Sequence, residues 1–112
     1  FQISWNESLN DLSGLDSIVS VGGDLEIRSN RLLVSLEGLE SLNEIGGSLI
    51  VTSNLWLSSI DSLFGLTVGP SHWSIYQNST LCISKVLEFQ DFVVGLPSGV
   101  PGAYLAGNDD GC

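Results

Sequence analysis

Few residues of this 112-residue sequence could take part in catalysis. His72 is the only histidine, and no Ser-His-Asp arrangement can be built around it. Residues 108–111 (Asn-Asp-Asp-Gly) are similar to the start of a calcium loop, but the further ligands that such a loop needs do not follow. We therefore interpret His72 as an exposed strand residue and 108–111 as a turn. The sequence predicts no enzyme, no cofactor and no metal site.

Two cysteines and two Asn-x-Ser/Thr sequons offer covalent chemistry of another kind. Cys82 and Cys112 could form one disulfide, which would place the protein in an oxidising compartment. The sequons begin at Asn6 and Asn78, and N-linked glycan at either would also fit secretion. A buried asparagine cannot carry glycan, so this prediction depends on where the fold places each one.

The charge balance excludes one large class of partners. Thirteen Asp and Glu face three Lys and Arg, and the net charge of −10 repels the phosphate backbone of nucleic acids. Hydrophobic residues make up 43% of the chain, which argues against disorder. No apolar run is long enough to predict a transmembrane segment. The length predicts one domain, and the lack of methionine indicates a mature segment without its targeting signal.

The sequence contains an internal repeat with a spacing of 24 residues. The segment GGDLEIRSN at 22–30 returns as GGSLIVTSN at 46–54. Apolar columns stand five and three residues before each repeat asparagine, and three, six, nine and twelve residues after each of the first three. The asparagine column consists of Asn6, Asn30, Asn54, Asn78 and, after a longer interval, Asn108.

Each part of the repeat predicts a local structure. The alternation before the asparagine predicts a strand with one buried face, and the apolar residue at every third position after it predicts a 3₁₀-like return. Buried asparagines can hydrogen-bond the backbone of neighbouring coils. Gly-Gly pairs at 22–23 and 46–47 are expected to permit the bend into the next strand. Stacked coils share one core, so the repeat predicts a mainly β, leucine-rich solenoid of about four to five coils.

This unit resembles a leucine-rich repeat, and more closely the repeat of the receptor L-domain subfamily. The matching residues are the L-x-I-x-x-N strands and the return SLEGLESLNEIGG at 35–47. The resemblance implies a short right-handed β-solenoid in a secreted or cell-surface protein. Such repeats serve adhesion, ligand binding and wall structure alike, so the resemblance does not select one function.

We expect leucine-rich repeats over 1–81 and a C-terminal cap over 82–112. Residues 84–94 place apolar side chains at helical spacing, with Ser84 at the N-cap position. This predicts a short helix over the open end of the core, although a partner-binding helix is an alternative. A final strand is expected at 103–108. The inward side chains of the helix are expected to be Val86, Leu87, Phe89 and Val93.

The repeat also pairs the two cysteines. Cys82 lies four residues after Asn78, and Cys112 lies four residues after Asn108. They therefore occupy the same position in consecutive coils. Adjacent coils lie about 4.8 Å apart, which is within disulfide distance, so the sequence predicts a Cys82–Cys112 bond.

Two groups of side chains are candidates for a partner surface. Outward strand positions form a sheet face, and apolar residues are expected on the outside of the turns. Leu32 and Trp56 stand at equivalent turn positions, and Phe64 stands where other coils have an acidic residue. A solvated face with incidental aromatic residues is an equally open interpretation. The candidate surface comprises Glu26, Arg28, Ile50, Tyr76, Tyr104, Leu32, Trp56 and Phe64.

The favoured function is a non-enzymatic extracellular structural or adhesion module that makes protein–protein contacts. Copies of the chain stacked end to end into a fibre are one such contact. The alternative is a receptor ectodomain fragment that binds a protein or glycan through the sheet face. In each case the acidic residues are expected to coat the outside of the coils, since none falls on an apolar or asparagine column.

Overall fold

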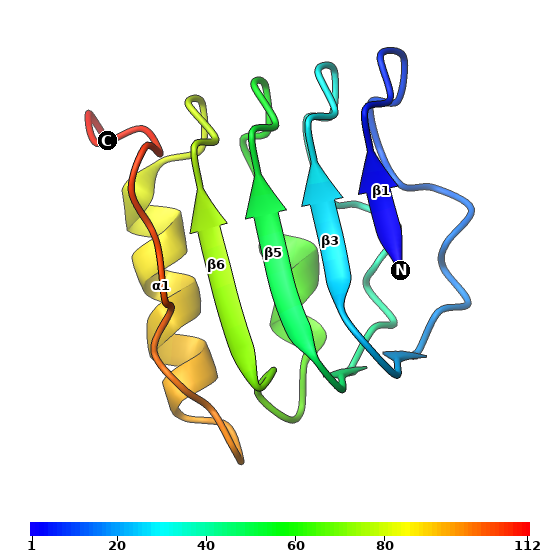
Figure 1. Ribbon diagram of the computed structural model, residues 1–112, viewed down its shortest axis with the longest axis vertical. Helices are drawn as coiled ribbons and strands as arrows, with labels where there is room; N and C mark the ends of the chain where they lie inside the picture. Colours follow the sequence, from blue (N-terminus) through cyan, green and yellow to red (C-terminus); the bar gives the residue numbers. More distant parts are fainter.

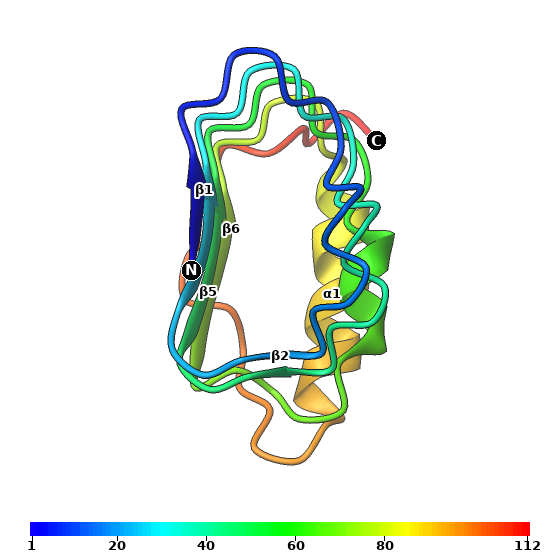
Figure 2. The ribbon, with the colours of Figure 1, turned by 90° about the vertical axis from the view of Figure 1, so that its right-hand side faces the viewer.

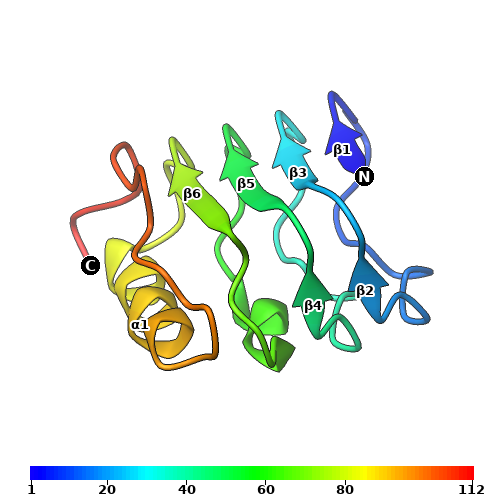
Figure 3. The ribbon, with the colours of Figure 1, turned by 60° about the horizontal axis from the view of Figure 1, so that its bottom comes forward.

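Parallel strands dominate the computed structural model, which describes residues 1–112. They stack in a solenoid-like arrangement of about three turns, and one α-helix lies at the C-terminal end (Figure 1). Four strands form a sheet in the order β1–β3–β5–β6, and two short strands, β2 and β4, pair at a bend (Figure 3). In chain order the elements are β1 (Gln2–Ser4), β2 (Ser20–Val21), β3 (Leu25–Arg28), β4 (Glu44–Ile45), β5 (Ser48–Thr52), the 3₁₀ helix η1 (Asp61–Gly65), β6 (His72–Tyr76) and α1 (Ile83–Val94).

The buried positions of neighbouring strands lie in register. Ile3 faces Ile27 across β1 and β3, and Val51 faces Ile75 across β5 and β6. Because side chains alternate along a strand, this register puts the apolar columns on the inner face of the sheet. A single cluster of 22 buried hydrophobic residues fills the space between the sheet and the return segments (Figure 2).

The return segments wind tightly through hydrogen bonds that span three residues. The N–H of Leu39 donates to the carbonyl oxygen of Leu36 at 3.1 Å, and the N–H of Leu42 donates to that of Leu39 at 3.0 Å. A path of this kind returns a side chain to the same side about every third residue. The apolar residues spaced by three residues are therefore buried in the second and third turns, as the repeat predicts, whereas Leu9 and Leu15 of the first turn are only partly buried.

One position of the return path differs between the turns. Gly14 and Gly38 stand eight residues after their asparagines, and their φ angles are +100° and +117°. The third turn has Ser62 at this position, and there the chain forms η1 instead. Left-handed backbone strains any residue with a side chain, so glycine and serine favour different paths here.

The second Gly-Gly pair allows close packing, whereas we expected both pairs to permit the bend into the next strand. None of Gly22, Gly23, Gly46 and Gly47 has a positive φ. A Cβ atom on Gly46 would lie 2.3 Å from the carbonyl oxygen of Gly22. Glycine is needed at positions 46 and 47 because this turn approaches the preceding one closely, and its conformational freedom is not used. A Cβ atom on Gly22 or Gly23 would have no neighbour within 4 Å.

Helix α1 covers the C-terminal end of the core near the predicted segment 84–94. Its N-cap residue is Cys82, so the expectation that Ser84 caps the helix is wrong. Leu87 is 45% exposed, which corrects its assignment to the inner face, because it is rotated by about 100° from Val86. The helix buries Val86, Phe89 and Val93. No helix of the structure has the length and apolar character needed to span a membrane.

Phe64 does not belong to the outer surface on which we placed it. It is partly buried, and its ring centroid lies 5.6 Å from that of Phe89 and 4.9 Å from that of Phe92. Trp73 also contacts Phe89, with ring centroids 5.1 Å apart. The repeat could not reveal this packing, because the partner of Phe64 is a helix that lies outside the repeat.

Candidate functional site

A ladder of asparagine side chains runs along the edge where the strands of the large sheet end. The Nδ2 atom of Asn54 donates to Oδ1 of Asn78 at 3.2 Å and to the carbonyl oxygen of Ile27 at 3.0 Å. Its Oδ1 atom accepts from the backbone N–H of Asn30 at 3.0 Å. Each buried amide therefore satisfies backbone groups of a neighbouring turn. The fully buried members are Asn30, Asn54 and Asn78, and the ladder ends at Asn6 and Asn108.

Each asparagine of the ladder follows a residue in the left-handed conformation. This residue ends the strand and lets the asparagine turn inward, while its own side chain lies at the surface. A non-glycine residue with this backbone costs about 1–2 kcal/mol, so the hydrogen bonds of the ladder must hold it in place. The φ angles lie between +56° and +80° in Trp5, Ser29, Ser53, Gln77 and Gly107.

The same edge carries a groove of about 410 Å³ that the sequence analysis does not predict. Trp5, which is 75% exposed, lines it and also lines a second hollow formed by residues 5–9. The groove lies between two columns of the repeat, one residue before and one residue after the asparagines. The columns are visible in the sequence, but only the turn geometry brings them together. The lining residues are Trp5, Ser29, Ser53, Glu7, Arg31 and Leu55.

The two sequons have different environments. Asn78 is fully buried, and its Nδ2 atom donates to the carbonyl oxygens of Val51 and Tyr76. This arrangement leaves no room for a glycan, so the prediction of glycosylation at Asn78 is wrong. Asn6 is exposed, and its side-chain amide donates one hydrogen bond, to Oδ1 of Asn30 at 2.9 Å. A glycosylated Asn6 would keep one amide hydrogen for that bond.

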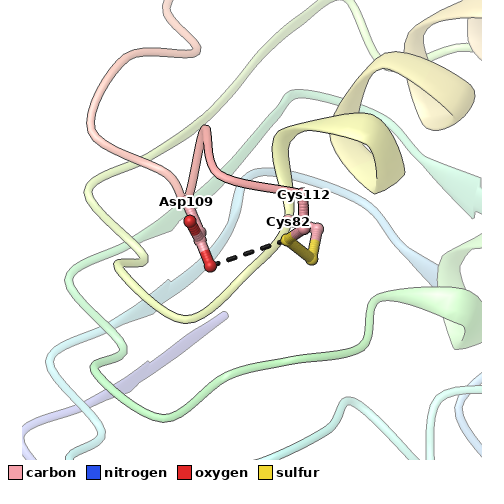
Figure 4. A group of neighbouring side chains, drawn as sticks. All are labelled: Cys82, Asp109 and Cys112. Atoms are coloured by element: carbon pink, nitrogen blue, oxygen red, sulfur yellow. Dashed lines mark hydrogen bonds between the residues drawn. A yellow bond between two sulfur atoms is a disulfide. The ribbon is translucent and has the colours of Figure 1, made fainter.

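The structure contains the Cys82–Cys112 disulfide, the pairing that the repeat predicts (Figure 4). The two Cα atoms lie 5.4 Å apart. Asp109 Oδ2 lies 3.5 Å from Cys112 Sγ, and the Asp109 backbone pairs with the segment around Cys82. The three residues together have the composition of a metal site. Both thiols are consumed by the disulfide, so this cluster ties down the C-terminus rather than offering thiolate ligands.

The outer face of the large sheet carries an ion pair and an aromatic pair. Arg28 forms a salt bridge with Glu26 on β3, and Ile50 lies in the strand beside them. The final strand expected at 103–108 is not formed, and a single bridge joins Tyr104 to Ser74 on β6. The N–H of Ile75 donates to the carbonyl oxygen of Tyr104 at 3.1 Å. The rings of Tyr76 and Tyr104 lie 4.9 Å apart.

Two outward strand positions of this sheet are buried. Thr52 and Ser74 are 3% and 6% exposed. Thr52 pairs in register with Arg28 and Tyr76, and Ser74 lies in the sheet beside Tyr104. Larger neighbours therefore cover these small side chains, and the candidate sheet surface consists of the ion pair, Ile50 and the tyrosines.

The turn residues Leu32 and Trp56 are 43% and 53% exposed. Each lies two residues after an asparagine of the ladder, at the position where the sequence analysis predicts an outer apolar group. Leu55, beside Trp56, is 45% exposed. The second and third turns therefore each expose apolar side chains outside the ladder.

The ionisable groups of the chain lie outside the buried core. None of the acidic residues is buried, which agrees with an acidic coat. The hydroxyl of Ser62 donates to Glu40 at 2.6 Å and, with the N–H of Gly38, holds the pKa of Glu40 below its usual value. His72 is exposed on β6, and its partner across the sheet is Ser48 rather than a carboxylate. No acid–base pair is assembled around it.

No protein-family model, no curated protein and no solved structure matches this chain.

Proposed function

We propose that this chain is a non-enzymatic extracellular module that makes protein–protein contacts, as structural and adhesion proteins do. The observation that carries the proposal is the exposure of Leu32 and Trp56 at equivalent positions of adjacent turns. Neighbouring exposed apolar residues are typical of interaction surfaces, whereas isolated ones are ordinary. The net charge of −10 opposes association through the rest of the surface. A second copy of the chain is one partner that could cover this patch.

We also propose that the chain is a right-handed leucine-rich solenoid of the receptor L-domain type. In this proposal it has four to five coils with a 24-residue period, repeats over 1–81 and a cap over 82–112. Support comes from the strand register, in which Gln2 pairs with Glu26, Leu25 with Leu49 and Ser48 with His72. The disulfide supports a secreted or cell-surface location, because disulfides persist in oxidising compartments.

Sedimentation velocity over a range of micromolar concentrations tests the self-contact. We expect the wild-type chain to gain mass with concentration and the double variant Leu32→Ser/Trp56→Ser to stay monomeric. Leu87→Ser is the matched control, because Leu87 is equally exposed but lies on α1. Negative-stain microscopy of the wild type then distinguishes a fibre from a closed oligomer. Assembly that survives in the double variant would rule out this surface, and a monomeric wild type would rule out self-association.

A second candidate function, a receptor ectodomain fragment, is favoured by the Tyr76–Tyr104 pair. Tyrosine rings on a sheet face can anchor a protein partner or stack on a glycan. Binding of the labelled chain to cell surfaces tests this function. Tyr76→Ala and Tyr104→Ala are expected to reduce binding without lowering the melting temperature, while Leu87→Ser binds like the wild type. Unchanged binding in both tyrosine variants would exclude the sheet face.

A further inference from the structure

We infer that the groove beside the asparagine ladder is a binding site for a short neutral saccharide. This site is separate from the sheet face and adjoins the Leu32–Trp56 surface at Leu55, which lines the groove. Its volume of about 410 Å³ falls within the range of roughly 300–1,000 Å³ that is usual for small-ligand pockets. Its lining combines one aromatic ring, two hydroxyls and two opposite charges, and each of these has a role toward a sugar.

Trp5 supplies an apolar platform. Its side chain is 75% exposed, although most of the surface of a tryptophan is normally buried in folded proteins. Its φ is +58°, and its backbone N–H donates to the carbonyl oxygen of Arg28 at 3.2 Å, so the backbone holds the ring at the surface. A pyranose ring has one face of C–H groups that can pack flat against an indole.

The remaining lining residues match the hydroxyl groups of a sugar. Ser29 and Ser53 each offer a hydroxyl that donates and accepts, Glu7 offers an acceptor and Arg31 offers several donors. Because Glu7 opposes an anion and Arg31 opposes a cation, the pair favours a neutral ligand rich in both donors and acceptors. A short saccharide has this chemistry.

The groove is formed before any ligand arrives. The backbone N–H of Ser29 donates to the carbonyl oxygen of Thr52 at 3.1 Å, which holds the left-handed turn in place. Beneath it, the buried side chains of Asn30 and Asn54 are joined by a hydrogen bond of 3.1 Å. A rigid site loses little conformational entropy on binding, so even a shallow groove can hold a ligand.

Nuclear magnetic resonance of the ¹⁵N-labelled full chain tests the inference. The indole N–H signals of Trp5, Trp56 and Trp73 report on the groove, the turn surface and the core. The probes are cellobiose, maltose, mannobiose and N,N′-diacetylchitobiose, each titrated separately to millimolar concentration. We expect at least one probe to shift the Trp5 signal saturably while the Trp56 and Trp73 signals stay in place.

Variants then locate the site. Trp5→Ala is expected to weaken binding at least about tenfold, Trp5→Phe to restore part of it, and Leu87→Ala to leave it unchanged. The indole of Trp5 is exposed, so its loss leaves folding intact and the comparison valid.

Several results would overturn the inference. One is the absence of a saturable Trp5 shift with all four disaccharides, and another is an equal shift of Trp56. Binding that is lost in Tyr104→Ala but kept in Trp5→Ala would place the sugar on the sheet face instead. A neutral peptide such as acetyl-Ala-Ser-Ala-amide that shifts Trp5 as strongly as any sugar would make this a peptide groove.

Discussion

Asn54 donates its side-chain amide to the side-chain oxygen of Asn78 across 3.2 Å, and both residues are fully buried. The same oxygen of Asn78 accepts from the backbone N–H of Asn54 at 3.1 Å. Nδ2 of Asn54 also reaches back to Ile27 in the preceding turn. One side chain therefore joins three successive turns, at the point where each strand gives way to a left-handed residue.

Asn54→Ala is expected to lower the free energy of unfolding by at least about 3 kcal/mol. The substitution removes the Asn54 partner of the buried Asn30 N–H and of the Ile27 carbonyl oxygen, and each such group costs about 1–3 kcal/mol. It also removes one of the hydrogen bonds made by Oδ1 of Asn78, which still accepts from the backbone N–H of residue 54. Urea denaturation followed by circular dichroism measures the loss. Asn6→Ala is the control, because Asn6 is exposed at the end of the ladder and should cost about 1 kcal/mol or less. Equal losses in the two variants would contradict the role of burial.

Gly38→Ala should be far more damaging than Gly14→Ala. Both glycines have a positive φ and stand at the same position of successive turns, so both variants suffer a strain of about 1–2 kcal/mol. Only at Gly38 would the new Cβ also collide, since it would lie 2.0 Å from the carbonyl oxygen of Leu12. The added overpacking is expected to bring the total loss to about 3 kcal/mol or more. Thermal and urea unfolding of both variants check the difference, and similar losses would refute the collision.

The hydrogen bond from Ser62 to Glu40 stabilises the fold at neutral pH, and this contribution is lost in acid. It holds the pKa of folded Glu40 below the unfolded value, with help from the N–H of Gly38. The resulting stabilisation is present above the unfolded pKa and is lost as the pH falls through the folded pKa. Ser62→Ala should raise the pKa of Glu40 and reduce this acid-dependent loss.

A carbon-detected NMR titration of the side-chain carboxyl groups measures the pKa of Glu40 in both chains. Ser17→Ala, at another exposed serine, is the control and should leave the pKa unchanged. If the pKa of Glu40 is the same in the wild type and in Ser62→Ala, the hydrogen bond is not its cause.

Removal of the disulfide is expected to destabilise the chain by roughly 3–4 kcal/mol. The estimate follows from the entropy of closing a loop between residues 30 positions apart. The double variant Cys82→Ser/Cys112→Ser and the reduced wild-type chain should unfold at similarly lowered urea concentrations. The matched control is the double variant with reductant, whose stability should not change. A wild type that is unaffected by reductant, with both thiols free by mass spectrometry, would argue against the bond.

When the chain is secreted from a eukaryotic cell, only one of its two sequons should receive an N-linked glycan. We expect Asn6 to carry the glycan, because it is exposed, and Asn78 to remain unmodified, because it is buried. Intact-mass measurement before and after enzymatic deglycosylation detects the modification, and Asn6→Gln should abolish it. A folded chain with glycan on Asn78 would contradict the burial of that side chain.

The repeat explains why much of the fold could be predicted from the sequence. A side chain at a given offset from the asparagine meets the same surroundings in each turn, so a column of leucine or asparagine indicates burial without knowledge of distant contacts. The inner strand positions, the return leucines, the ladder and the position shared by the two cysteines all follow from this rule. Phe64 and Leu87 were placed wrongly because their surroundings depend on how α1 packs, and α1 lies outside the repeat.

By itself, the sequence determined which columns are buried, because periodic apolar residues have no other way to leave water. Only the tertiary structure decided how exposed each member of a column is and which residues of different turns become neighbours. It buried Asn78 beneath its neighbours while leaving Asn6 exposed, and it brought Trp5 and Ser53 to one groove although 48 positions separate them. The physical reason is that stacking sets residues from different turns side by side, and their exposure depends on the size and conformation of those neighbours.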